Sequence, residues 1–150
     1  MTKQFRRLRP AKLVDPLTPA ERSRCMSRIH GKDTKIEMQL RTAIWSKGLR
    51  YRLHAKLPGT PDLAFPKSKV ALFIDGCFWH GCPEHGVRPK TNRGFWAKKL
   101  KQNFARDERT NVELRRTGWK VVRCWEHDVE RNLDGLVMRL SRIVNARQRV

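Results

Sequence analysis

The stretch VALFIDGCFWHGC, residues 70–82, decides the fold of this chain. Its first part, residues 70–74, is apolar at every position. A strand without polar alternation is typical of the middle of a sheet that is covered on both faces. The run ends at Asp75, and the next residues, 76–94, are rich in glycine, proline and cysteine, which indicates a loop. We therefore expect a central strand with a long loop at its carboxyl end.

The sequence on either side of this strand predicts a mixed α/β fold. Two capping boxes, Thr18-Pro19-Ala20-Glu21 and Thr34-Lys35-Ile36-Glu37, begin helices that should end near Gly31 and at Gly48. The later elements expected in chain order are a half-buried strand over 49–53, a short strand over 62–65, the central strand, a long helix that ends at Gly118 and buries Leu100 and Phe104, a strand over 119–125 and an amphipathic helix over 133–143. This order predicts a central mixed sheet flanked by helices.

The length of 150 residues suits one domain. We expect a basic N-terminal tail over 1–17, a folded domain over 18–146 and a short tail over 147–150. The longest apolar run is too short to cross a bilayer, and the basic start is not followed by the apolar stretch of a signal peptide. These features predict a cytoplasmic protein, in which cysteines are reduced and serve metal binding more often than disulfides.

The net charge indicates a polyanionic partner. Lys and Arg number 34 against 14 acidic residues, which gives a formal charge of +20 spread along the chain. Solubility alone rarely calls for so large a charge, and no basic helix with a broad apolar face suggests a membrane surface. Nucleic acid is therefore the expected partner.

Cysteine and histidine spacing predicts a structural zinc site. Cys77, Cys82 and His85 follow the pattern C-x4-C-x2-H, and Cys124 at the end of a later strand could supply the fourth ligand. A metal would fix a loop that is too polar to fold on its own contacts. The alternative is that Cys124 is a buried core thiol and the two loop cysteines are incidental. Cys25 is interpreted as a packing residue.

Carboxylates at the strand ends suggest a second metal. Asp62 and Asp75 would lie together if the strand register allows it, and Glu37 could reach the same pocket from its helix. Paired carboxylates hold magnesium, which can activate water and neutralise charge on a phosphate. Spacing alone is equally consistent with aspartates that merely end strands.

Aromatic and polar side chains near these groups suggest DNA contacts. Phe78 and Trp79 lie in the loop, where exposed rings could stack on bases, although they could instead pack inward on the metal site. In the long helix one face carries an aromatic, a cation, an amide and a carboxylate: Trp96, Lys99, Asn103 and Asp107. Such a face could read base edges, or it could be an ordinary solvated surface.

Together these residues resemble the very short patch repair (Vsr) mismatch endonucleases. The resemblance is carried by Pro61-Asp62, by the run from Phe73 to Pro83, by Phe95-Trp96, and by Asn103 and Arg106-Asp107. It implies a restriction-endonuclease-like (PD-(D/E)xK) fold and strand-specific nicking of duplex DNA 5′ of the thymine in T·G mismatches, which arise when 5-methylcytosine deaminates. It also implies catalytic magnesium, a companion cytosine-5 methyltransferase, a link to mismatch-repair proteins and a monomeric enzyme of the bacterial nucleoid.

The resemblance also assigns roles by matching position. Asp62 and the backbone carbonyl of Ile74 correspond to magnesium ligands, His80 to the general base oriented by Asp107, and Glu37 to an outer carboxylate. The DNA-contacting residues correspond to Phe78, Trp79 and Trp96 in the major groove, Met26 in the minor groove, and Lys99 and Asn103 at the mispair. Related nucleases carry lysine where this chain has Cys77, which shifts proton handling to His80, and some relatives have histidine in place of Asp75.

Two other functions fit the same residues. One is a restriction-like nuclease that cuts matched DNA. The other is a zinc-containing module that binds DNA without cutting it. Cleavage of a matched plasmid would favour the first, and activity that is indifferent to the loss of Asp62 would favour the second.

Overall fold

The computed structural model describes residues 17–27, 33–86 and 89–149. The chain divides into two compact units, Met1–His30 and Gly31–Val150. In the first unit, helix α1 (Pro19–Ser27) begins with the expected capping box, in which Glu21 N–H donates to Thr18 Oγ1 and the Glu21 carboxylate accepts from Thr18 N–H. The expected helix end near Gly31 and most of the basic tail lie outside the described residues, and the domain limits at 17 and 146 stay predictions.

The second unit begins with helix α2 (Lys35–Ser46). Its N-cap is the predicted Thr34, whose Oγ1 accepts a hydrogen bond from Glu37 N–H at 3.2 Å. The helix stops where Gly48 takes a φ of +80°, a left-handed conformation that glycine adopts without steric cost. Both helix ends are therefore where the sequence predicts them.

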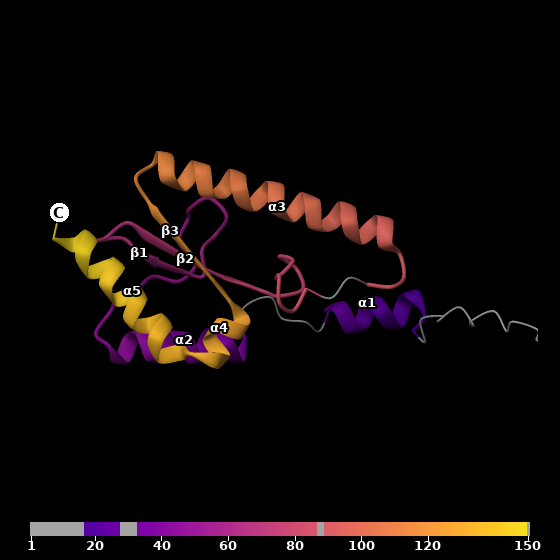
Figure 1. Cartoon of the computed structure of the whole chain (residues 1–150), viewed down its shortest axis with the longest axis horizontal. Helices are drawn as coiled ribbons and strands as arrows, with labels where there is room; N and C mark the ends of the chain where they lie inside the picture. Colours follow the sequence, from indigo (N-terminus) through magenta and orange to yellow (C-terminus); the bar gives the residue numbers. More distant parts are fainter. Residues whose placement is uncertain (1–16, 28–32, 87–88, 150) are drawn as a thin grey trace, which may run out of the picture. The chain divides into compact units, whose positions relative to one another are not determined.

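A mixed three-stranded sheet lies at the centre of this unit (Figure 1). Its order is β1 (Leu63–Phe65), β2 (Val70–Asp75) and β3 (Lys120–Trp125), with β1 antiparallel and β3 parallel to β2. The predicted central strand is thus confirmed. Because β2 and β3 are parallel, both carboxyl ends lie at one edge of the sheet, with Asp75 opposite Trp125.

The strand expected over 49–53 is wrong. That segment contributes only an isolated bridge between Arg52 and Ala64. Apolar and polar residues do alternate in this segment. However, β1 is only three residues long, so it offers few backbone groups with which another strand could pair. Leu53 accordingly stays 40% exposed.

Helices cover both faces of the sheet (Figure 1). The long helix α3 (Arg93–Arg116) lies on one face, where Ala71 and Phe73 pack with Leu114. On the other face α2, α5 (Leu133–Gln148) and the short α4 (Glu126–Arg131) enclose the larger core. Alternate residues of β2 enter the two cores, which explains why this strand is apolar throughout.

Two helical details differ from expectation. Helix α4 has no counterpart among the predicted elements, because six residues carry too little periodic signal. In α3 the buried side chains are Asn103, Thr110 and Leu114, whereas Phe104 is 52% exposed. The expected buried side of α3 was therefore wrong, and part of its mixed polar face, at Asn103 and Asp107, turns inward.

Candidate active site and metal centre

A cavity of about 470 Å³ opens at the carboxyl end of β2. Its chemistry-bearing lining residues come from four places: the residue before β1, the end of β2 with its following loop, the middle of α3, and β3. They include Asp62, Asp75, His80, Asp107 and Arg123. The strand order thus gathers the sequence-predicted carboxylates and histidine at one edge of the sheet.

Asp62 is fixed by the backbone of β2. Its Oδ2 accepts a hydrogen bond from Ile74 N–H at 2.7 Å. Burial raises the pKa of Asp62, and the nearby charges of Glu37 and Asp75 raise it further, while the Ile74 hydrogen bond acts in the opposite direction. A carboxylate crowded by other carboxylates is stabilised by a bound cation, so this donor set suits a divalent metal ion.

His80 and Asp107 form a close pair across the cavity. The Nδ1 atom of His80 lies 2.6 Å from Asp107 Oδ2 and 3.7 Å from Asp75 Oδ1. A carboxylate accepts only, so Nδ1 carries the proton and Nε2 is left as a proton acceptor. This is the arrangement that a general base requires.

Arg123, which sequence reasoning missed, completes this group. It lies on β3 directly opposite Phe73, and its Nη1 donates to Asp75 Oδ1 at 2.6 Å. Val122 and Cys124, its neighbours, face the larger core, so the alternation of β3 could have placed Arg123 on the α3 face.

Glu37 lies behind the cavity rather than in its lining. Its carboxylate accepts from Thr34 Oγ1 at 3.2 Å, from Asp33 N–H at 3.0 Å and from Arg41 Nη2 at 2.9 Å. Arg41 also pairs with Asp33. Glu37 therefore reaches Asp62 through its charge, as the pKa of Asp62 reflects.

A second cluster, here called the Cys/His centre, joins the loop after β2 to helix α4. It consists of Cys77, Cys82, His85 and His127, whose ligand atoms all lie within 4.8 Å of one another. The Nδ1 atom of His127 is 3.2 Å from Cys77 Sγ, 3.6 Å from Cys82 Sγ and 3.3 Å from His85 Nδ1. Tetrahedral zinc with ordinary bond lengths needs ligand separations of about 3.3–3.8 Å. The four residues therefore fit a metal ion of this kind.

The expected fourth ligand, Cys124, lies elsewhere. It pairs with Ile74 inside the sheet, and its thiol points to the Phe73 carbonyl at 3.6 Å. Burial raises the pKa of Cys124 to about 12, as expected for a thiol packed inside the sheet. Asp75 is opposite Trp125, so Cys77 and His127, each two residues further on, leave the sheet together. The Cys124 expectation is corrected to His127 for this reason.

The loop aromatics pack on one another and on α3. The Phe78 ring centroid is 5.0 Å from that of Trp79 and 5.1 Å from that of Trp96. All three side chains are partly buried, whereas Phe95 beside them is 59% exposed. They form one aromatic cluster next to the cavity, rather than rings held out singly into solvent.

The remaining predicted DNA contacts have different surroundings. Asn103 is 7% exposed and its Nδ2 donates to the Trp79 carbonyl at 2.9 Å, which ties α3 to the loop. Lys99 is exposed on the same helix. Met26 belongs to α1 in the other unit, and its side chain lies outside the described residues.

Sequence comparison places these residues in a known family. A sequence model described as DNA mismatch endonuclease Vsr matches residues 14–85, which include α2, β1, β2 and most of the loop. A protein of Xanthomonas oryzae pv. oryzae named Type II nicking enzyme V.XorIIP is 39% identical over 138 residues, which cover 89% of this chain and 98% of that protein. This chain belongs to the Vsr family of DNA endonucleases.

Two other relatives match about three quarters of the chain. The Type II nicking enzyme V.NaeI of Lentzea aerocolonigenes is 45% identical over 115 residues, covering 73% of this chain and 69% of that protein. The DNA mismatch endonuclease Vsr of Escherichia coli is 37% identical over 117 residues, covering 76% and 74%. The relatives of this Vsr-family chain therefore include proteins named for nicking and a protein named for mismatch cleavage.

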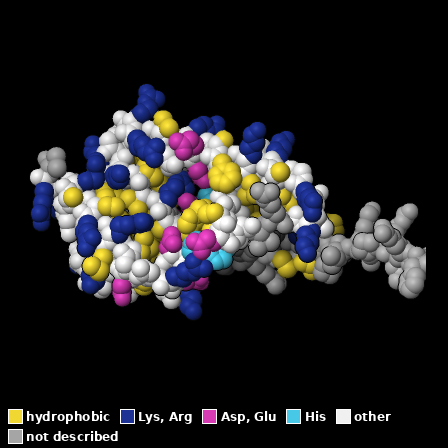
Figure 2. Space-filling model, viewed as in Figure 1, with side chains coloured by type: hydrophobic (Ala, Val, Ile, Leu, Met, Phe, Trp, Pro, Cys, Tyr) yellow, Lys and Arg dark blue, Asp and Glu magenta, His cyan; other side chains and the backbone are white. Residues whose placement is uncertain are grey.

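The surface of the chain suits the DNA that a Vsr-family endonuclease acts on. Lys and Arg side chains are spread over the face in Figure 2, and acidic and histidine side chains gather near its middle. Among the described residues, no helix has both the length and the apolar character needed to cross a bilayer.

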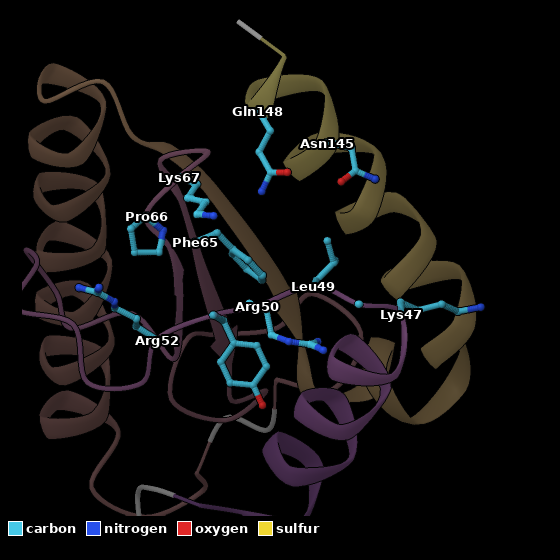
Figure 3. Close-up of a pocket in the computed structure, with 11 residues that line it drawn as sticks. Lys47, Leu49, Arg50, Arg52, Phe65, Pro66, Lys67, Asn145 and Gln148 are labelled. Atoms are coloured by element: carbon cyan, nitrogen blue, oxygen red, sulfur yellow. The ribbon is translucent and has the colours of Figure 1, made fainter.

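A different cavity, also about 470 Å³, lies at the opposite end of β1 (Figure 3). Its lining includes four cations, Lys47, Arg50, Arg52 and Lys67, and no carboxylate. It therefore cannot hold a divalent metal ion or supply a general base. The cavity at the end of β2 is the candidate active site of this Vsr-family chain.

Proposed function

We propose that this chain is a strand-specific nicking endonuclease that cleaves duplex DNA 5′ of the thymine in T·G mismatches and so initiates very short patch repair. The observation that carries the proposal is the meeting of Asp62 with the His80–Asp107 pair in one cavity. The relatives named for mismatch cleavage and for nicking support it. We also propose a restriction-endonuclease-like fold, which the membership of the chain in the Vsr family supports.

Asp62 and the backbone carbonyl of Ile74 would hold a magnesium ion. The N–H and C=O of one strand residue point to the same side, so the Ile74 carbonyl faces the side on which Asp62 accepts the Ile74 N–H. β1 pairs with β2 only up to Leu72, which leaves this stretch of the β2 edge open. Magnesium would polarise the scissile phosphate and neutralise its developing charge.

His80 supplies the base of the reaction. Its Nε2 takes a proton from the attacking water as the water oxygen bonds to phosphorus and the P–O bond to the leaving strand breaks. Asp107 keeps the Nδ1 proton in place and stabilises the imidazolium that forms. Glu37, held by Arg41, adds negative charge behind Asp62 and favours the bound cation.

The Cys/His centre would hold zinc as a structural ion. Cys77 and His80 belong to the same turn, in which His80 N–H donates to the Gly76 carbonyl at 3.1 Å. Glu126 also accepts from Cys77 N–H at 3.3 Å. Fixing Cys77 to zinc therefore fixes the imidazole three residues later.

The aromatic cluster is the proposed mismatch reader. Phe78, Trp79 and Trp96 would enter the base stack from the major groove, because ring stacking is available to any base. Lys99 would contact the mispair and Asn103 would hold the loop for it, with Met26 on the minor-groove side. A cytosine-5 methyltransferase and mismatch-repair proteins are the proposed functional partners of a monomeric cytoplasmic enzyme.

A nicking assay tests the proposal. Duplexes that differ only in a T·G or T·A pair are incubated with the protein and magnesium, and each strand is labelled separately. Cleavage of the thymine strand of the T·G duplex alone is expected, and Asp62→Asn should abolish it while DNA binding persists. Equal cleavage of both duplexes would instead indicate a nuclease for matched DNA. DNA binding without any cleavage, in the parent and in Asp62→Asn alike, would indicate a non-catalytic zinc module.

A further inference from the structure

A different partner holds each nitrogen atom of the Arg123 guanidinium. Nη1 donates to Asp75 Oδ1 at 2.6 Å, and Nε donates to Asn111 Oδ1 at 3.2 Å. Nη2 lies 3.6 Å from Asp107 Oδ1. The guanidinium also lies over the Phe73 ring, 4.6 Å from its centroid. Such a side chain has one orientation, which is set by two strands and by α3.

The same two carboxylates flank His80. Asp107 uses Oδ2 for His80 Nδ1 and presents Oδ1 to Arg123. Asp75, which is only 7% exposed, gives Oδ1 to Arg123 at 2.6 Å, and that atom lies 3.7 Å from His80 Nδ1. Two partly buried carboxylates beside one imidazole repel each other unless a cation lies between them. Arg123 is the cation that meets both carboxylates, whereas the 60%-exposed Arg106 approaches Asp107 Oδ1 alone, at 3.8 Å.

We propose that Arg123 is a positioning residue of the nicking reaction and that Asp75 is its anchor rather than a second metal ligand. The inference rests on the function proposed above. A magnesium ion on the Asp75 carboxylate would lie a few ångströms from the guanidinium and meet its positive charge. Among the described residues no cation forms an ion pair with Asp62, on which Arg41 acts only at longer range, and Asp62 faces the open edge of β2. Arg123 thus reserves the metal for Asp62 and, through Asp107, sets the direction of the His80 ring.

Magnesium titration separates the two roles of Asp75. The rate of nicking of a T·G duplex is measured against magnesium concentration for the parent, Asp75→Asn and Asp62→Asn. We expect the half-saturating concentration for Asp75→Asn to stay within about threefold of the parent, because an amide still accepts from Arg123. Asp62→Asn should raise it at least tenfold or abolish nicking. A tenfold rise in Asp75→Asn would overturn the anchor role.

Substitution of Arg123 tests the positioning role. Arg123→Met keeps the apolar stem and should lower the single-turnover rate about 100-fold, the effect of misplacing a catalytic group by about 1 Å. DNA affinity should stay within about threefold, and Arg123→Lys should recover part of the rate since it keeps the charge. Arg142 is an exposed arginine on α5, so Arg142→Met is a matched loss of one positive charge. It should change neither the single-turnover rate nor the DNA affinity. Loss of affinity with an unchanged rate would make Arg123 a DNA contact and overturn the proposal.

The double variant Arg123→Met/Asp75→Asn probes the charge directly. Removing Asp75's charge removes the repulsion that Arg123 offsets, so the double variant should be faster than Arg123→Met alone. If the rate losses of Arg123→Met and Asp75→Asn multiply in the double variant, the two residues do not act through a shared cause. If Arg123→Met does not fold, Arg123→Lys and the Asp75→Asn titration still decide the matter.

A spectroscopic readout keeps this proposal distinct from the proposed function. The ¹⁵N shifts of the His80 imidazole report whether Nδ1 carries the proton, with or without nicking activity. Nδ1 protonation is expected in the parent and in Arg142→Met, with a redistribution between the ring nitrogens in Arg123→Met. Unchanged His80 shifts in Arg123→Met would refute the positioning role. If the parent does not nick T·G duplexes, but Arg123→Met still shows this redistribution, the proposed nicking function is refuted and the positioning role of Arg123 is not.

Discussion

The imidazole of His80 lies 2.6 Å from the carboxylate of Asp107, although 27 residues separate them in the chain. One residue belongs to the loop after β2 and the other to the middle of α3. The connection between them carries Cys82 and His85 of the Cys/His centre and Trp96 of the aromatic cluster, so each of these features bears on the pair. The hydrogen bond between Asn103 and the Trp79 carbonyl joins the same two segments next to it.

Asp107→Asn should lower the nicking rate without lowering DNA affinity. An amide can turn its NH₂ group toward Nδ1, which favours the tautomer with the proton on Nε2 and removes the base. The expected loss is about 10²–10⁴-fold, the usual contribution of a positioned base. Single-turnover nicking and a binding titration measure the two quantities. Glu108→Gln, a neighbouring exposed acid, is the control. A rate within threefold of the parent would exclude Asp107 from the reaction.

His127→Ala should lose the structural metal, whereas Cys124→Ala should retain it. His127 Nδ1 lies within 3.6 Å of both loop cysteine sulfurs, while the Cys124 thiol points to the Phe73 carbonyl. Metal content per chain and thermal unfolding are measured on both variants. Loss of a structural zinc lowers the free energy of unfolding strongly, because metal binding is coupled to folding. Cys124→Ala should cost about 1 kcal/mol, as an ordinary core truncation does. If purified Cys124→Ala contains no metal, Cys124 is a metal ligand, as the spacing in the sequence predicts.

Local signals account for what the sequence predicted correctly. The apolar run of β2, the hydroxyl–glutamate pairs that begin α1 and α2, and Gly48 each act within a few residues. Strand ends pointed to Asp62 and helix spacing to Asp107, whereas the catalytic roles of His80 and Asp107 came from a resemblance. Their common cavity depends on the sheet order.

Long-range geometry accounts for what the sequence did not give. The exchange of Cys124 for His127 follows from the parallel register that sets Asp75 opposite Trp125, and spacing alone does not contain a register. Arg123 was missed for the same reason. Asn103 was assigned to an outward face because a helix shows its period in the sequence, but not which side meets the loop.

The four cysteines should differ in reactivity toward a thiol-alkylating reagent. Cys25 is exposed and should react first. With a pKa of about 12, Cys124 is ionised to only about one part in ten thousand at pH 8, and it should stay unmodified in the folded protein. Cys77 and Cys82 should react only after a chelator removes the metal. Mass spectrometry of the labelled peptides assigns each site. Equal rates for Cys25 and Cys82 before chelation would argue against a bound metal.

DNA affinity should fall steeply with salt concentration. Each neutralised phosphate contributes about −0.9 to the slope of log affinity against log salt, so six contacts would give a slope of about −5. Lys99→Gln should make the slope shallower by up to about 1, because it removes one positive charge that faces the DNA. Arg142 lies on α5, across the sheet from α3 (Figure 1), so Arg142→Gln should leave the slope unchanged. A flat dependence would contradict the role that the net charge of +20 indicates.

Lys99 and Asn103, one turn apart on α3, should respond oppositely to alanine. Asn103 is buried, and its loss leaves the Trp79 carbonyl without its donor, which should cost about 1–3 kcal/mol of stability. Lys99 is exposed, so Lys99→Ala should change stability by less than about 0.5 kcal/mol and should instead weaken DNA binding. Denaturant unfolding and a binding titration separate the two effects. If Asn103→Ala keeps full stability yet loses T·G preference, Asn103 reads the mispair directly, and its bond to Trp79 must open when DNA binds.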